Sequence, residues 1–284
     1  MTRFEDTKEN KRALVELLYL LADDNFIHAH RGSEWLGLAP HIEEDVAFSS
    51  INQDTMGHAV MYYRLLEDLG EGNADDISHL RKPSQYRNAI ILEEKNGSGE
   101  YTEKPDYDWA FTVVRHLFYD LAKKIRLDSM KQSSYEPLAV TARKIVTEQY
   151  YHLLHWELWF KQLMQSTEEA RRKMEAAICR VWRDFGGVLT LGPNGDQMAA
   201  AGLIESEELL IKRWMNRIEA LFTEVKFPMP TEKPDMAQGD GRKGEHTDDL
   251  QHALDTLSEV YKSDEDAIGW EEVSIVNEEE KEQQ

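Results

Sequence analysis

The stretch IVTEQYYHLLHWELW, residues 145–159, places Glu148 and His152 four residues apart in an otherwise apolar and aromatic run. In an α-helix, residues four apart lie on the same face. Carboxylates and imidazoles can bind transition metals, and a buried carboxylate needs a metal, a cation or hydrogen-bond donors to compensate its charge. The stretch therefore indicates a metal site, the remains of one, or a polar network that joins helices.

Three other helical segments also place carboxylates among apolar residues. One holds Asp24 four residues before His28, the second holds Asp54 four before His58, and the third holds Asp120. Inward carboxylates and histidines from four helices resemble the di-iron carboxylate bundles, where two helices give one Glu each and two give Glu-x-x-His. The candidate metal ligands are Asp24, Asp54, His58, Asp120, Glu148 and His152.

The spacing of these candidates departs from the di-iron pattern. Thr55 stands three residues before His58, and Tyr151 stands three residues after Glu148, at positions where Glu-x-x-His requires a glutamate and a histidine. Three of the four carboxylates are aspartates, which are one methylene shorter than glutamate. A working di-iron centre, a vestigial site and a metal-free network all stay open. We expect no working metal, catalytic or cofactor-binding site in this chain, and treat the six residues as candidates for a vestigial metal site.

Apolar residues at steps of three and four predict that long helices position these side chains. Residues 73–104 are polar and turn-rich, with QYRNAIILEE as an extended or irregular apolar segment. Gln132-Ser133-Ser134 is expected to cap the helix that contains Glu148, and Ser166 to Glu169 matches a capping box for the next helix. No alternation of strands and helices is present. The expected helices cover residues 11–31, 41–69, 106–130, 137–165, 166–187, 206–225 and 247–261.

Composition limits the class of partner. The chain has 284 residues and 41% apolar content, with 54 acidic against 33 basic residues and a net charge of −21. Nucleic acid and anionic membranes are disfavoured as partners, because both attract basic surfaces. Cys179 is the single cysteine, so a disulfide or cysteine-based metal site within one chain is excluded, as is typical of a reducing compartment. We expect a cytoplasmic protein without a signal peptide or transmembrane helix.

The loop GDGRKGEH, residues 239–246, allows two interpretations. Its backbone N–H groups and its two cations, next to a helix N-terminus, could hold a phosphate. Alternatively, it is a flexible loop whose glycines serve turns, which is the commoner case.

Several segments together resemble a known family. They are DDNFIHAHRGSEWLGLAPHIEEDVAFSSINQD (23–54), RKPSQYRNAIILEEKNGSGEY (81–101), TEQYYHL around Glu148, GDGRKGEHTDDL (239–250) and the final Gly269-Trp270. In this order they are similar to the C subunit of the bacterial ring 1,2-phenylacetyl-CoA epoxidase, over about residues 15–270. The resemblance implies an all-α fold: a ferritin-like four-helix bundle core with additional C-terminal helices. We expect one domain over residues 1–270 and a disordered acidic tail over residues 271–284.

The resemblance also implies a function in aerobic phenylacetate catabolism. The family is a multicomponent oxygenase that epoxidises the aromatic ring of phenylacetyl-CoA. Its ferritin-like catalytic subunit binds the di-iron centre together with the CoA thioester, and a reductase with FAD and an iron–sulfur cluster supplies electrons from NADPH. The implied role of this chain is a structural, non-catalytic partner of the catalytic subunit, in contact with the other subunits and without a cofactor of its own. Two alternatives stay open: a chain that binds di-iron itself, and a scaffold for another acyl-CoA oxygenase.

Overall fold

The computed structural model describes residues 4–99, 101 and 103–263, and its architecture is all-α. The four longest helices are α1 (Lys8–Ser33), α2 (Ile42–Asp68), α5 (Trp109–Met130) and α6 (Glu136–Met164). α1 packs along α2, α5 packs along α6, and α2 contacts α6, so the four form a bundle of the ferritin-like type. The predicted fold class is therefore confirmed, whereas the expected tail, residues 271–284, lies outside the described residues.

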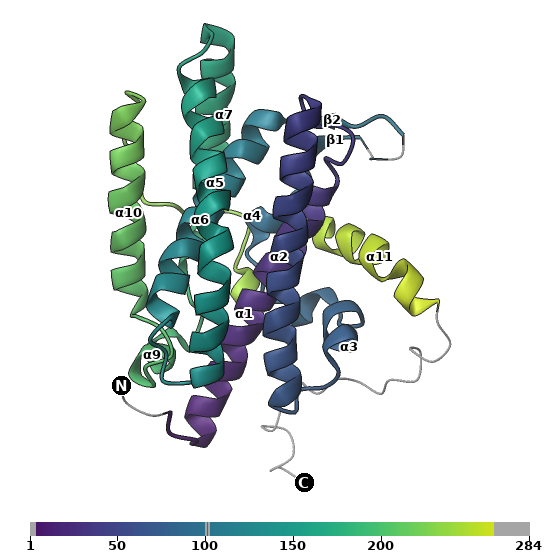
Figure 1. Ribbon diagram of the computed structural model, residues 1–284, viewed down its shortest axis with the longest axis vertical. Coiled ribbons are helices and arrows are strands. Elements are labelled where there is room, and N and C mark those ends of the chain that lie inside the picture. The colour runs from purple at the N-terminus through teal and green to yellow at the C-terminus, as the bar shows by residue number, and fades with distance from the viewer. Residues whose placement is uncertain (1–3, 100, 102, 264–284) are drawn as a thin grey trace.

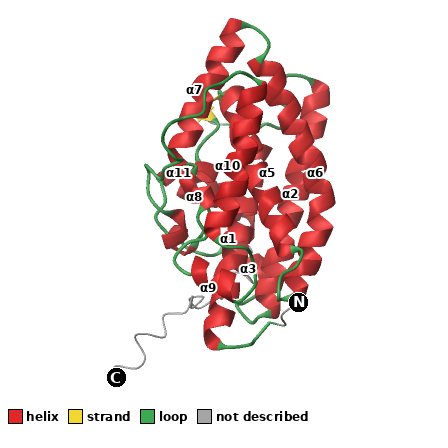
Figure 2. Ribbon diagram, turned by 90° about the vertical axis from the view of Figure 1, so that its left-hand side faces the viewer, coloured by secondary structure: helices red, strands yellow, loops and turns green. Residues whose placement is uncertain are grey.

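The bundle and its additional helices form three layers (Figures 1 and 2). α2 and α6 make one outer layer, and α1 and α5 lie behind them. The inner pair is buried almost all round over its central turns, because shorter helices cover its other side. These coverings are α3 (Ala74–His79), α4 (Ile90–Glu93), α7 (Glu168–Asp184), α8 (Gly186–Leu189), α9 (Gly195–Ala200), α10 (Glu207–Glu224) and α11 (Asp248–Lys262).

Short elements complete the fold. They are two 3₁₀ turns, Pro83–Gln85 and Gly241–Lys243, and the two-residue strands β1 (Gly97–Ser98) and β2 (Asp106–Tyr107), which pair in antiparallel fashion. Ile90–Glu93, inside the segment expected to be extended or irregular, is instead one helical turn whose residues are all buried. Burial of Ile91 and Leu92 against the bundle favours this turn over a strand, for which the neighbouring chain offers no long edge.

Two predicted helix starts need correction. α6 has Tyr135 at its N-cap without a side-chain cap, and Pro137 sits in its first turn. Ser133 provides no cap to α6, since the chain turns into the helix only after Ser134. α7 is capped by Thr167, whose hydroxyl accepts from the Ala170 N–H, rather than by Ser166. The prolines and caps at the other ends agree with the predictions to within a few residues.

The bundle packs tightly where α1 meets α2. Gly32 lies on the α1 side of this contact, and a Cβ there would overlap the Asn52 side chain of α2. A larger residue at position 32 would therefore displace the Asn52 side chain from its place between the two helices. In the part of the chain that the structure describes, no helix is long and apolar enough to cross a membrane.

Candidate functional site

Five of the six predicted ligand residues gather where α2, α5 and α6 meet. His58 Nε2 lies 2.7 Å from Glu148 Oε2, and His152 Nε2 lies 3.0 Å from Asp54 Oδ2. Both pairs join α2 to α6, which run antiparallel, and Asp120 comes from α5 behind them. We call His58, His152, Asp54, Glu148 and Asp120, together with the lysine described next, the Lys123 cluster.

Lys123 of α5 is the member that the ligand prediction missed. Its ammonium Nζ lies 2.9 Å from His58 Nδ1, and the residue is 4% exposed. A signal for it was present, since Lys123 follows Asp120 by three residues and His116 by seven, which places all three on one face of α5. The helical spacing that identified Asp120 as a candidate therefore also places a lysine on the same face of α5.

The hydrogen bonds of His58 fix its protonation. An ammonium has no acceptor, so Lys123 donates and His58 Nδ1 accepts with its lone pair. The proton of the neutral ring is then on Nε2, where it is donated to Glu148. Burial and the nearby Lys123 charge lower the pKa of His58 well below its ordinary value, which agrees with a neutral ring. Lys123, His58 and Glu148 therefore form one directed chain from the interior to the surface.

Burial shifts the other titrating groups in the Lys123 cluster. It raises the pKa of Asp120, against the effect of the Lys123 ammonium, and lowers the pKa of His152. Burial also lowers the pKa of Lys123 to about 8, although Asp120, Glu148 and Asp54 act in the opposite direction. At pH 7 the lysine therefore keeps most of its charge and offsets the surrounding carboxylates.

The two carboxylates at the front of the Lys123 cluster are not core groups. The side chains of Asp54 and Glu148 are 44% and 49% exposed, whereas His58 and His152 are buried. The core position next to Glu148 belongs to Gln149, whose amide donates to the Asp120 carbonyl at 3.4 Å. Glu148 and His152 thus lie along the edge of α6 that faces α2, with the histidine directed inward and the carboxylate at the surface.

Asp24 lies apart from the other candidates, and its assignment to a shared site was wrong. It accepts two hydrogen bonds from Arg242, at 2.7 and 2.9 Å, one from Arg126 at 3.3 Å, and one from the Ala89 N–H at 2.9 Å. We call Asp24, Arg126 and Arg242 the Asp24 cluster. Asp24 is 1% exposed, and two guanidiniums already balance its charge. Its face of α1 turns toward α4 and the 3₁₀ turn Gly241–Lys243, away from Asp54.

The same contacts decide between the interpretations of the GDGRKGEH loop. Arg242 is buried in the pair with Asp24, and Lys243 lies 3.2 Å from Asp240. His246 Nδ1 lies 2.8 Å from Glu93 Oε2, which also ties the loop to α4. The interpretation of the loop as a phosphate site is therefore wrong, because its cations are already paired. The loop instead packs against α1 through Arg242 and against α4 through His246.

The Lys123 cluster does not fit the di-iron centre that ferritin-like bundles imply. The His58 lone pair is engaged by an ammonium, which repels a cation placed beside it, and Asp24 is absent from the group. Among the described residues, no three His, Cys, Asp or Glu side chains converge as a metal-binding group. The arrangement that the residues do support is a metal-free polar network, with Lys123 as its internal cation.

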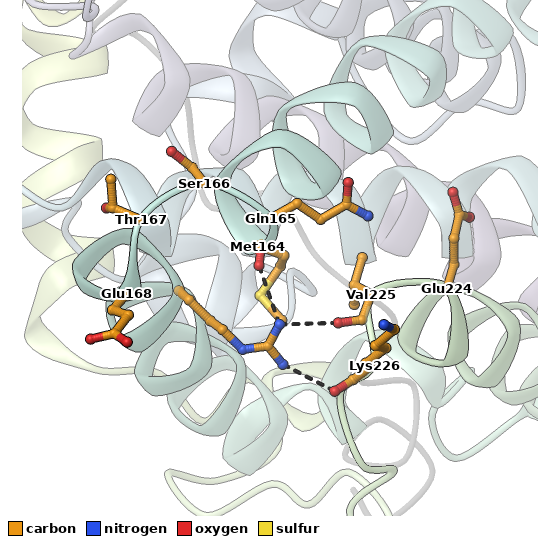
Figure 3. A pocket seen from close by; sticks show the side chains of 9 residues that line it. Met164, Gln165, Ser166, Thr167, Glu168, Glu224, Val225 and Lys226 are labelled. Atoms are coloured by element: carbon orange, nitrogen blue, oxygen red, sulfur yellow. Dashed lines mark hydrogen bonds between the residues drawn. The ribbon is translucent and has the colours of Figure 1, made fainter.

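A surface hollow of about 360 Å³ lies away from this cluster, between the α6–α7 turn and the end of α10 (Figure 3). Arg171 spans it and donates to the carbonyls of Met164, Val225 and Lys226. The guanidinium thus caps the ends of α6 and α10, and the hollow lies where these two helices terminate.

The bundle with its lysine-centred polar network defines a helical, ferritin-like protein without a fitting di-iron site. The comparisons with known proteins identify its relatives. The family model described as "Phenylacetic acid catabolic protein" matches residues 2–270, so the chain belongs to that family. It is also similar to the C subunit of the 1,2-phenylacetyl-CoA epoxidase of Escherichia coli (strain K12), with 26% identity over 231 residues, which cover 81% of this chain and 88% of the relative.

Proposed function

We propose that this chain is a structural, non-catalytic subunit of a multicomponent oxygenase that epoxidises the aromatic ring of phenylacetyl-CoA. Membership of the phenylacetic acid catabolic family and the similarity to the C subunit of an epoxidase support the reaction and the complex. The observation that carries the non-catalytic role is Lys123, whose buried ammonium donates to His58 within the candidate ligand set.

The proposal divides the work of the enzyme between subunits. The chemistry belongs to a ferritin-like catalytic subunit with a di-iron centre, and electrons reach it from NADPH through a reductase that carries FAD and an iron–sulfur cluster. This chain contributes no cofactor and supports the catalytic subunit through a helical interface. The internal charge of Lys123 takes the place of a metal as the group that compensates Asp54, Asp120 and Glu148.

The first test is the metal content of the chain when it is produced alone with iron supplied, measured by plasma emission. We expect substoichiometric iron that is the same in the wild type and in the triple variant Asp54→Ala, Glu148→Ala, His152→Ala. Equal values show that any metal found is adventitious. About two irons per wild-type chain, lost in the triple variant, would instead establish a di-iron subunit with chemistry of its own and overturn the proposal.

The second test is assembly and turnover. Purified with the reductase and the catalytic subunit from the same organism, the wild type and the triple variant should support phenylacetyl-CoA epoxidation at equal rates once bound. Failure of the wild-type chain to associate with the catalytic subunit would remove the proposed function altogether.

A further inference from the structure

The centre of the bundle holds buried polar side chains whose hydrogen bonds are incomplete. They lie between α1, α5 and α6, and none is more than 3% exposed. Within the ranges that the structure describes, each of them has a nitrogen or oxygen atom without a hydrogen-bond partner. We call this set the buried polar column, and its members are His28, His116, Asp120, Gln149, His152 and Trp156.

The column has two levels that lie about one helical turn apart. At the first level, the ring of His116 on α5 contacts His28 of α1 and Trp156 of α6, with centroids 4.0 and 4.7 Å away. At the second level, the Gln149 amide of α6 donates to the Asp120 carbonyl of α5. His116 and Asp120 are separated by about 6 Å along α5. The incomplete groups are therefore neighbours in space.

The first level offers both donors and acceptors. His116 Nδ1 lies 2.8 Å from the Thr112 carbonyl, which only accepts, so Nδ1 holds the proton and Nε2 presents a lone pair. Burial lowers the pKa of His28 well below its ordinary value, so its neutral ring has one N–H and one lone pair. Trp156 Nε1 only donates. A ligand at this level must therefore accept from two N–H groups and donate to two lone pairs.

The second level presents mainly acceptors. Gln149 donates through Nε2, which leaves its Oε1 as an acceptor beside Asp120 Oδ2. His152 uses Nε2 in its hydrogen bond to α2, so Nδ1 of the neutral ring is a lone pair. Lys123 has three N–H groups and gives one of them to α2. This level therefore needs a species that accepts from an ammonium and donates to oxygen and nitrogen.

These requirements select the chemical class of the ligand. Buried polar atoms in folded proteins are in most cases bonded to protein or to ordered water, because leaving them unbonded costs free energy. A metal cation takes lone pairs only, and the Lys123 ammonium repels it. An anion takes N–H groups only, and it would face the acceptors of Asp120 and Gln149. Water both donates and accepts, and a buried water typically makes about three hydrogen bonds.

We propose that the buried polar column binds a file of ordered water molecules, which carries hydrogen bonds from His28 to the Lys123 cluster. The file reaches solvent at the seam between α2 and α6, which the pairs His58–Glu148 and Asp54–His152 mark. Asp54 and Glu148 are half exposed there, so the file exchanges with bulk water at this point. The inference concerns the chain alone and goes beyond the proposed function.

The test counts the long-lived internal waters of the full chain by magnetic relaxation dispersion of the solvent. Gln149→Leu removes the amide of the second level, and His116→Phe removes the lone pair of the first, each with little change of shape. We expect each variant to lose at least one internal water and the double variant to lose the most. Gln162→Leu is the matched control, since it makes the same change at an exposed position of α6, and its count should equal that of the wild type. Circular dichroism and Tm verify that each variant folds.

A high-resolution crystal structure of the wild type is the second measurement, and it does not depend on any variant. We expect ordered water within hydrogen-bond distance of Gln149 Oε1 and of His116 Nε2. The inference is overturned if the column atoms bond directly to one another there, or if both column variants keep the water count of the wild type. A metal bound by the wild type and lost in Gln149→Leu, by plasma emission, would also overturn it. Neither measurement involves the catalytic subunit, so failure here leaves the proposed association untouched.

Discussion

The Asp24 cluster and the Lys123 cluster compensate the negative charge of carboxylates among apolar helices in two different ways. Asp24 is 1% exposed and receives hydrogen bonds from two guanidiniums and one backbone N–H. Asp54 and Glu148 are 44% and 49% exposed at the side chain and receive one hydrogen bond each, from a neutral or weakly basic histidine. Asp24 is enclosed by protein, whereas Asp54 and Glu148 are half exposed to solvent at the seam between α2 and α6.

The difference teaches that an apolar stripe does not by itself fix the burial of a carboxylate. Asp24 and Asp54 both precede a histidine by four residues in an apolar helix. Asp24 is on the inner helix α1, where the 3₁₀ turn Gly241–Lys243 covers it, and Asp54 is on the outer helix α2, where no described segment does. The surrounding layer, rather than the helix pattern, decides which carboxylate needs a permanent counter-charge.

The largest effect is expected from Asp24→Asn. The amide keeps the shape but leaves Arg126 and Arg242 buried without a carboxylate, and breaking a buried ion pair typically costs about 3–5 kcal/mol. The free energy of unfolding, from urea titration, should fall by that amount. Asp54→Asn is the matched control, because it makes the same chemical change at the half-exposed position and should cost less than about 1 kcal/mol. Equal losses for the two variants would contradict the contrast between the clusters.

A smaller effect is expected from the pH dependence that Lys123 contributes. Its pKa is lowered to about 8 in the folded chain from an ordinary value of 10.5, because it is buried. Between these two pH values, the unfolded chain holds a proton that the folded chain has released, so this group makes stability rise with pH. Relative to Lys123→Met, the wild type should gain roughly 3 kcal/mol of unfolding free energy between pH 8 and 10.5.

The control for this measurement is Lys124→Met, since Lys124 pairs with Asp128 near the surface. Its difference from the wild type should stay flat over the same pH range. If Lys123→Met also gives a flat difference, Lys123 is solvated in the folded protein and does not act as the internal cation of the cluster.

The sequence predicted the bundle well because its four long helices have periodic apolar residues and clear ends. It also predicted that Asp54, His58, Asp120, Glu148 and His152 share a region, since spacing places them on faces that meet. It could not place Asp24, because its partner Arg242 lies 218 positions further along the chain in an irregular loop. The three-residue spacing from Asp120 also places Lys123 on the same face of α5. It was missed because only residues that can bind a metal were considered, and a lysine ammonium cannot.

The elements that the sequence missed share a physical cause. α8 and α9 are one or two turns long, too short to show helical periodicity, and they form because the bundle covers them. The helical turn Ile90–Glu93 likewise depends on burial against α1 rather than on its own propensity. Tertiary contacts therefore determine where these short helices form against the bundle.

The smallest effect is expected from His152→Leu. Leucine fills most of the apolar space of the ring, and Asp54, already half exposed, regains water in place of its 3.0 Å hydrogen bond. The loss should be about 0.5–1.5 kcal/mol, the usual value for one hydrogen bond. A double-mutant cycle with Asp54→Asn isolates the pair, and its coupling energy should stay below about 1 kcal/mol. Coupling of several kcal/mol would mean that Asp54 is as secluded as Asp24, and that the seam between α2 and α6 is closed in the isolated chain.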